Sequence, residues 1–209
     1  MKNKIEINCH SSIKINSNLI IYIDPFKINN KCSDADIIFI THDHYDHYDI
    51  ESINNIRKND TIIVIPSSMK DKVLNEFMDG NIFDVIPNKE YEVKGIKFNT
   101  IPSYNVNKKF HLKEYNWVGY LIDINGELIY IAGDTDETLE NKNIKCDIAL
   151  VPIGGTYTMN YIEAVDLINN MKPKVVIPTH YGEIVGTIED GIKFKELIID
   201  KIDCILLIK

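Results

Sequence analysis

A short histidine-rich stretch, residues 41–47, constrains this chain more than any other part of its sequence. The stretch reads Thr-His-Asp-His-Tyr-Asp-His and directly follows the apolar run 37–40, which is typical of a buried strand. It holds three of the six histidines of the chain. Imidazole and carboxylate groups are the usual ligands of zinc and similar divalent ions, so the stretch predicts a metal site at the end of a strand.

The spacing within this stretch suits a corner between a strand and a helix. Along an extended chain alternate side chains share a face, which would let His42, His44 and Asp46 converge. Along a helix residues three apart share a face, which would bring His47 below His44. The side chains between these ligands would then point away, namely Asp43 and Tyr45. A solvated polar loop is the alternative, and the concentration of histidine argues against it.

Length, charge and cysteine spacing narrow the class of protein. A chain of 209 residues fits one domain, 1–209, and its net charge of −8 argues against a nucleic-acid partner, which requires basic surface. The sequence has no apolar run long enough to span a membrane and no signal-peptide pattern at its start. Its four cysteines include no Cys-x-x-Cys pair. We therefore expect a cytoplasmic protein with reduced thiols that binds neither nucleic acid nor membrane.

Short strands and helices account for the rest of the chain. Hydrophobic periodicity predicts strands at 4–9, 13–15, 19–23, 37–40, 61–65, 82–86, 91–94, 96–101, 117–124, 127–132, 148–152, 175–178 and 204–208. It predicts helices at 48–58, 67–78, 160–171 and 190–199. In the helix 67–78, Ser67 or Ser68 is the expected cap and Leu74 is expected to face inward. Two sheets packed face to face with helices outside would satisfy this order, and so would a plain α/β layer fold.

Three further residues are candidate ligands. Asp134 follows the predicted strand 127–132 and His180 follows the predicted strand 175–178, so both lie at strand ends. Each has an ordinary alternative, a helix N-cap for Asp134 and a structural role for His180. His111 lies in the loop 102–116, which is long enough to indicate a function. It is a ligand or a substrate contact, or else a solvated loop histidine.

Other residues could support the site without binding a metal ion. Asp24 is expected to accept a hydrogen bond from a ligand imidazole and fix its tautomer, while His10 either lines the site or has a core role. Backbone N–H groups of residues 154–156 (Gly-Gly-Thr) could cradle an anion, unless the segment is only a turn. Lys108 and Lys109 could contact a substrate phosphate or carboxylate, or simply face solvent.

With these motifs the chain resembles the metallo-β-lactamase superfamily. The pattern His-x-His-x-Asp-His at 42–47 matches the signature of that superfamily in full. The segments 9–12, 23–26, 104–105, 133–136, 152–159 and 178–182 further resemble the branch that contains L-ascorbate-6-phosphate lactonase and many metal-dependent hydrolases. The Gly-His context common in the family is absent at His111. The resemblance implies an α/β fold of four layers, the αββα sandwich.

The resemblance also implies a ligand set and a reaction. One metal ion would be held by His42, His44 and His111, the other by Asp46, His47 and His180, with Asp134 bridging the two. The two divalent ions, zinc or else manganese or iron, would share a water whose pKa falls from 15.7 towards about 7. The metal-bound hydroxide would attack a small ester, lactone or phosphodiester, with Asp46 and His180 as the catalytic residues and Asp46 accepting a proton in transit.

Three other functions are compatible with the same motifs. A lipid phosphodiesterase of the superfamily would need an apolar membrane-docking patch, which the sequence does not show. A metal-binding protein without hydrolytic activity would be expected to lack a ligand, whereas every expected ligand type has a candidate here. An iron redox protein would be expected to carry a flavin-binding domain, which this sequence lacks. A small-molecule substrate is therefore the favoured partner, and the motifs indicate no particular oligomeric state.

Overall fold

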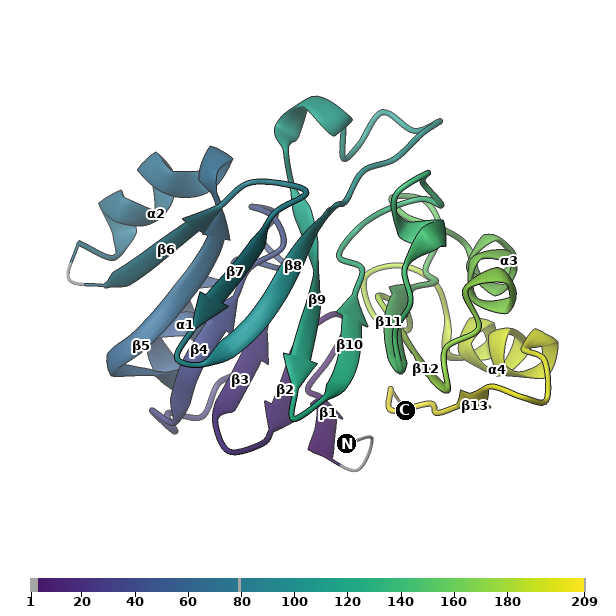
Figure 1. Ribbon diagram of the computed structural model, residues 1–209, viewed down its shortest axis with the longest axis horizontal. Helices are drawn as coiled ribbons and strands as arrows, with labels where there is room; N and C mark the ends of the chain where they lie inside the picture. The colour runs from purple at the N-terminus through teal and green to yellow at the C-terminus, as the bar shows by residue number, and fades with distance from the viewer. Residues whose placement is uncertain (1–3, 79, 209) are drawn as a thin grey trace.

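Two β-sheets packed face to face, with helices on their outer faces, make up the fold. The computed structural model describes residues 4–78 and 80–208. Within these residues the first sheet has six strands in the order β1-β2-β3-β4-β5-β6, and the second has seven in the order β13-β12-β11-β10-β9-β8-β7. Figure 1 shows α1 and α2 beside the first sheet and α3 and α4 beside the second. The αββα sandwich is confirmed, and the plain α/β layer fold is not what forms.

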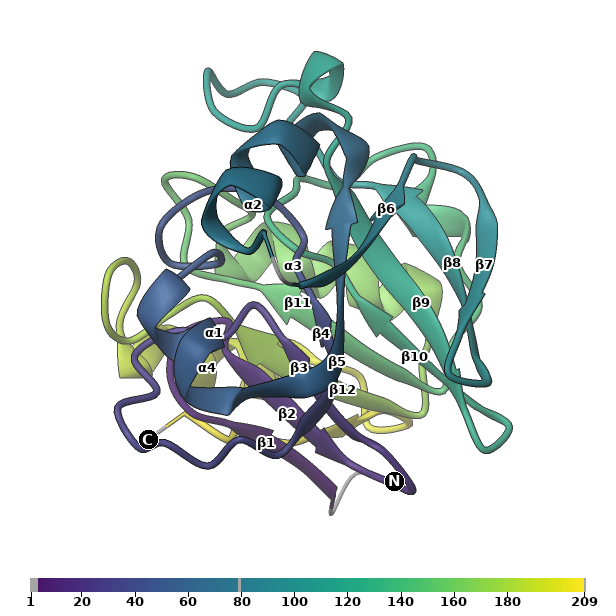
Figure 2. The same cartoon turned by 90° about the vertical axis from the view of Figure 1, so that its left-hand side faces the viewer.

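The first sheet and its helices come from residues 5–85. Their bounds are β1 Ile5–Ile7, β2 Ile13–Asn16, β3 Ile20–Ile23, β4 Ala35–Phe39, α1 Ile50–Ile56, β5 Arg57–Pro66, α2 Lys70–Glu76 and β6 Asn81–Val85. The strands β1, β2 and β3 pair antiparallel, and β3 to β6 pair in parallel. Figure 2 shows α1 and α2 lying in front of this sheet.

The second sheet and its helices come from residues 90–204. Their bounds are β7 Glu90–Val93, β8 Ile96–Pro102, β9 Val118–Ile124, β10 Glu127–Ile131, β11 Ile148–Pro152, α3 Tyr161–Met171, β12 Val175–Thr179, α4 Ile188–Leu197 and β13 Asp203–Cys204. The strands β7 to β10 pair antiparallel, and β10 to β13 pair in parallel. Asn125 and Gly126 have φ angles of 56° and 81°, as the tight hairpin between β9 and β10 requires.

The strand β4 is buried on both of its faces, which explains the apolar run that precedes the histidines. Ile37 and Phe39 point into the core between the two sheets, and Ile38 points into the core under α1 and α2. The ring of Phe39 lies 5.0 Å from that of Phe98 and 4.9 Å from that of Tyr120, both of the second sheet. Packing on both faces fixes the strand that carries the histidine stretch.

Some local predictions were wrong in detail. Neither Ser67 nor Ser68 caps a helix, because a short 3₁₀ turn, Ser67–Met69, comes before α2. The hydroxyl of Ser67 donates instead to Asp84 Oδ2 at 2.9 Å. Leu74 does not face inward and is 40% exposed. The predicted terminal strand is cut short, since β13 pairs only with Val175 and Val176 of β12.

The helices of the fold are short and mostly amphipathic. Across residues 4–78 and 80–208, every helix is too short or too polar to cross a lipid bilayer.

The C-terminal end of α3 generates a prediction about stability. Lys172 follows the last turn of the helix in the left-handed conformation, with φ 56° and ψ 55°. Glycine adopts this conformation without the steric cost that a Cβ atom brings. We expect Lys172→Gly to raise the free energy of unfolding by about 0.5–1 kcal/mol, measured by urea denaturation. The matched control, Lys193→Gly inside α4, should lower it by a similar amount. Equal losses in both variants would contradict the argument.

Candidate metal centre

The seven candidate ligands lie where the carboxyl ends of several strands meet. The strand β4 is followed by His42, His44, Asp46 and His47. Asp134 follows β10, His180 follows β12, and His111 lies in the loop between β8 and β9. Ligands in open α/β sheets bind outside the carboxyl ends of strands, for the same topological reason. The structure brings all seven together in three overlapping groups.

The histidine stretch forms a tight turn between its second and third histidines. The backbone N–H groups of His47 and Tyr48 both donate to the carbonyl oxygen of His44, at 3.0 and 2.8 Å. A helix begins only at Ile50, with Asp49 as its N-cap. His42 and His44 converge as expected, but the turn places Asp46 in a different group.

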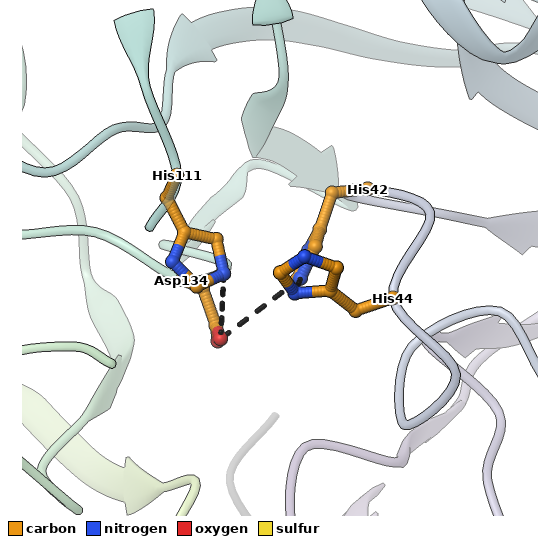
Figure 3. Close-up of side chains that lie close together, drawn as sticks. All are labelled: His42, His44, His111 and Asp134. Carbon is orange, nitrogen blue, oxygen red and sulfur yellow. Dashed lines mark hydrogen bonds and ion pairs between the residues drawn. The ribbon is translucent and has the colours of Figure 1, made fainter. Parts of the chain in front are cut away.

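The first group consists of His42, His44, His111 and Asp134, whose ligand atoms all lie within 4.8 Å of one another. Figure 3 shows the two histidines of the stretch facing His111 and Asp134 across a small gap. Asp134 Oδ2 lies 3.2 Å from His111 Nε2 and 3.9 Å from His42 Nε2. Two ligand atoms that share one tetrahedral zinc ion lie about 3.4 Å apart, so this spacing fits a single ion.

Two more groups lie on the other side of Asp134. One consists of His10, Asp46 and His180, and the other of His47, Asp134 and His180. His180 Nε2 lies 3.1 Å from Asp134 Oδ2 and 3.6 Å from Asp46 Oδ2. His47 Nε2 lies 3.3 Å from Asp134 Oδ1. Asp134 therefore contacts ligand candidates on both sides, which is the position that a bridging carboxylate requires.

Buried polar atoms without a hydrogen-bond partner converge on the same place. They are both ring nitrogens of His10 and His180, Nε2 of His47 and His111, and Oδ1 of Asp134. Leaving such an atom unsatisfied costs about 1–3 kcal/mol. Imidazole nitrogens and carboxylate oxygens oriented toward one another are the donor set that a divalent ion satisfies, so these residues fit a metal centre.

The protonation states of Asp134, Asp46 and His42 suit cation binding, whereas His47 and His180 must lose a proton to bind an ion. Burial alone would lower the pKa of His47 and His180, but Asp134 raises both. Burial alone would raise the pKa of the Asp134 carboxyl, but His180 and His47 hold this pKa well below its usual range. Burial also acts against the ionisation of Asp46, and the neighbouring His10 and His180 nevertheless lower its pKa. Burial lowers the pKa of His42 well below its usual value. The site thus presents two ionised carboxylates beside a neutral imidazole.

Asp24 holds one of the histidines in place. Its Oδ2 lies 2.8 Å from His47 Nδ1, and the carboxylate accepts hydrogen bonds from Thr41 N–H at 2.8 Å and Thr41 Oγ1 at 2.7 Å. This confirms the expected contact between Asp24 and a candidate ligand imidazole. Because Nδ1 of His47 faces Asp24, its Nε2 is left facing Asp134.

His10 belongs to the site, although its sequence context left a core role equally open. Its side chain is fully buried, and its Nε2 lies 3.2 Å from Asp46 Oδ2. The ring centroid lies 3.8 Å from that of His180, and the carbonyl oxygen of His10 accepts the N–H of His180 at 3.1 Å. His10 follows β1. Its position directly after a strand predicted from the sequence could have identified it as a residue of the site.

The backbone of the site is strained at several residues. His10, Asp24, His111 and His180 have φ angles of 52°, 47°, 55° and 57°, in the left-handed region that non-glycine residues avoid. Each such residue costs on the order of 1–2 kcal/mol, and strain of this kind is concentrated at functional sites. Gly133, with φ 63°, makes the turn before Asp134, where a Cβ atom would lie 3.0 Å from Thr41 Cβ.

The helix N-cap alternative for Asp134 is wrong. The described residues from 132 to 138 contain no helix, and the Asp134 side chain is buried among the histidines.

The four-layer fold and the buried His/Asp cluster at its strand ends define an αββα protein with a candidate metal centre. A family model described as the beta-lactamase superfamily domain matches residues 4–180. The chain belongs to this superfamily and has the metallo-β-lactamase fold.

Relatives across nearly the whole length carry related names. A UPF0173 metal-dependent hydrolase of Thermococcus onnurineus is 31% identical, over 98% of this chain and 96% of the relative. A UPF0173 metal-dependent hydrolase of Thermoplasma volcanium is 32% identical, over 93% of this chain and 90% of the relative. The solved structure of a protein called a metal-dependent hydrolase, from Parabacteroides distasonis, superposes with a TM-score of 0.84. The two chains are 28% identical, and the match covers 98% of this chain and 93% of that one.

The single tryptophan of the chain offers a direct readout of the first group. The Trp117 ring lies 4.8 Å from that of His42, 5.0 Å from that of His44 and 5.5 Å from that of His111. We expect zinc added to chelator-treated protein to change Trp117 fluorescence. Free zinc at a concentration about 100 times its dissociation constant should raise the melting temperature of the protein by about 5–10 °C. His44→Ala should weaken both responses, whereas Asp43→Asn, whose carboxylate pairs with Lys72, should keep them. A full response in His44→Ala would contradict the grouping.

The contact between Asp24 and His47 generates a second prediction. Removing the partner that orients a ligand histidine typically lowers metal affinity about 10–100-fold. We expect a loss of this size in Asp24→Asn, measured by competition with a chelator of known affinity. The control is Asp84→Asn. The Asp84 carboxylate pairs with Lys70 and lies far from the histidines along the chain, so this variant should leave the metal affinity unchanged. Equal affinities in the two variants would show that Asp24 does not position His47.

Proposed function

We propose that this protein is a metal-dependent hydrolase that uses two divalent ions to activate water against a small ester, lactone or phosphodiester. The observation that carries the proposal is the convergence of all six histidines with Asp46 and Asp134 around buried, unsatisfied ligand atoms. The names of the relatives support hydrolysis as the reaction class. The motifs shared with the L-ascorbate-6-phosphate lactonase branch support a lactone or ester as the reacting group.

The proposed ligand set combines residues of the three groups, with Asp46 and His47 taken from the two groups that share His180. His42, His44 and His111 would hold one ion, Asp46, His47 and His180 the other, and Asp134 would contact both. Zinc fits this mixture of nitrogen and oxygen donors, and manganese or iron would also be accepted. Bound divalent ions supply a water of lowered pKa and Lewis acidity toward the electrophile.

The residues of the chain then orient the reaction. Five of the candidate ligands line a cavity of about 250 Å³, namely His44, Asp46, His111, Asp134 and His180, so a substrate there meets the site directly. Asp46 Oδ2 lies 3.2 Å from His10 Nε2 and 3.6 Å from His180 Nε2, and Asp46 would accept the proton of the attacking water. His10 and Asp24 keep Asp46 and His47 in position. The small volume supports a small-molecule substrate.

The cavity supports an enzyme over a metal-binding protein without activity. A purely structural metal site is closed, with all positions filled by protein ligands, whereas a catalytic site keeps access for substrate. Here the ligand candidates face a cavity.

The four cysteines are free, which supports a reducing, cytoplasmic location.

We expect His44→Ala and Asp134→Ala to abolish hydrolysis while the protein still folds. Each variant removes a ligand from the first group, and Asp134→Ala also removes the shared carboxylate. Metal content of the purified protein would be measured together with hydrolysis of lactone, ester and phosphodiester panels after loading with zinc or manganese. Circular dichroism would confirm folding, and Asp43→Asn would be the active control. Unchanged turnover in both alanine variants would rule out the proposed site.

A further inference from the structure

The cavity beside the candidate ligands has a distinctly apolar wall. Its polar floor consists of ligand candidates, and the other lining residues are Tyr45, Phe110, Tyr157 and Ile184. Among the residues that the structure describes, no lysine or arginine lines this cavity. Tyr45, which was expected to point away from the site, is 66% exposed at its rim, and Phe110 is 47% exposed. Large apolar side chains exposed beside a polar cluster are a typical feature of a ligand-binding surface.

Two aromatic residues of the apolar wall, Phe110 and Tyr157, are held in place before any ligand binds. The rings of Phe110 and Tyr157 meet edge to face, with centroids 4.8 Å apart and an angle of 85°. The side-chain amide of Asn105 donates to the carbonyl oxygens of both residues, at 3.0 Å to Phe110 and 2.7 Å to Tyr157. One buried residue therefore joins the two loops that carry the wall. A preorganised apolar surface of this kind reduces the ordering cost of binding.

The groups that could recognise an anionic substrate are already engaged. Lys108 pairs with Asp136 and lies 3.9 Å from Glu163, while Lys27 pairs with Glu183. Lys109 is exposed and does not line the cavity.

The glycine-rich segment at 154–156 is partly engaged in local backbone hydrogen bonds. The N–H of Gly155 donates to the carbonyl oxygen of Met159, and the N–H groups of Tyr157 and Thr158, which follow the segment, donate to the carbonyl oxygen of Gly155. An anionic tail against the apolar wall would lose hydration without gaining a lysine or arginine partner, because none of the described lysines and arginines lines the cavity.

We propose that the site takes small, uncharged esters or lactones whose apolar group packs against Phe110, Tyr157, Tyr45 and Ile184, in preference to phosphorylated or carboxylate-bearing substrates. This inference rests on the proposed hydrolase function. Water adds its oxygen to the carbonyl carbon, the acyl carbon–oxygen bond breaks, and the products are an alcohol group and a carboxylate with release of one proton. The cavity of about 250 Å³ is smaller than sites for drug-sized ligands, so the substrates are compact.

The first test measures kcat/KM of the metal-loaded enzyme on matched lactones. The series is γ-butyrolactone, γ-valerolactone and γ-hexalactone, compared with the carboxylate-bearing 5-oxotetrahydrofuran-2-carboxylate, and acid release is followed with a pH indicator. A parallel ester series compares ethyl butyrate with monoethyl succinate. We expect kcat/KM to rise about 4-fold per added methylene and the charged members to fall at least tenfold below the neutral ones. Charged members that equal or exceed the neutral ones would overturn the inference.

The second test measures binding without turnover. The unreactive lactam 5-ethyl-2-pyrrolidinone carries an apolar ethyl group, and 5-oxoproline carries a carboxylate at the same ring position. Calorimetry on metal-loaded protein should show the neutral lactam binding at least ten times more tightly. Tighter binding of 5-oxoproline would overturn the inference.

Variants of the wall separate packing from chemistry. Phe110 is half exposed, so Phe110→Ala is expected to fold, and it should remove the gain from added methylenes mainly by raising KM. Phe110→Lys should shift the preference toward the charged lactone and lactam. Val106→Ala, on the same loop but outside the cavity lining, is the matched control and should keep the wild-type preference. An unchanged preference in both Phe110 variants would show that the wall does not select the substrate.

The outcomes distinguish failure of this inference from failure of the proposed function. Hydrolysis with preference for phosphorylated or carboxylate-bearing compounds would overturn only the inference about the substrate. Absence of hydrolysis across lactones, esters and phosphodiesters in fully metal-loaded protein would overturn the hydrolase proposal on which the inference rests.

Discussion

The buried carboxylate of Asp134 is the constraint on which the rest of the site depends. A lone ionised carboxylate in a protein interior is very costly, and it is stable only when opposite charge or strong donors surround it. Here His42, His47, His111 and His180 all have a ring nitrogen within 3.9 Å of its oxygens. These histidines come from both sheets, so the two halves of the fold must pack together before Asp134 acquires its partners. A pair of cations bound there would join the two sheets as well as serve the reaction.

Much of this arrangement could be predicted from the sequence, because the strongest signals are local. The apolar run 37–40 followed by closely spaced histidines identifies β4 and its ligands, and Asn125-Gly126 identifies the hairpin before Asp134. The grouping of ligands could not be read from spacing, because it depends on which strand ends meet in space. The turn at His44–His47 separates Asp46 from His44, and the order of the strands brings His10 to His180. Tyr45 is largely exposed, as expected of a side chain that points away from the ligands, but it also lines the cavity, which the spacing did not predict.

The strained residues show where stability was given up for the site. His10, Asp24, His111 and His180 all hold left-handed backbones that glycine would adopt more easily, yet only imidazole or carboxylate side chains supply the contacts seen here. The surrounding structure compensates through regular elements, including capping boxes at α3 and α4 and a core that fills the space between the sheets. The strained residues of the site all lie in loops at strand ends, outside the paired strands of the two sheets.

The position of the wall residues along the chain affects how this fold can diversify. Phe110 is the immediate neighbour of His111, and Tyr45 lies between His44 and Asp46, so an insertion at either position would displace a candidate ligand. Tyr157 and Ile184 line the same cavity but are separated from Asp134 and His180 by several residues. Natural drift toward new substrates is therefore expected to accumulate at 157 and 184, where the recognition surface can change shape without disturbing the ion-holding framework. Two residues of the apolar wall, Tyr157 and Ile184, can therefore change more freely than Tyr45 and Phe110, which lie next to candidate ligands in the sequence.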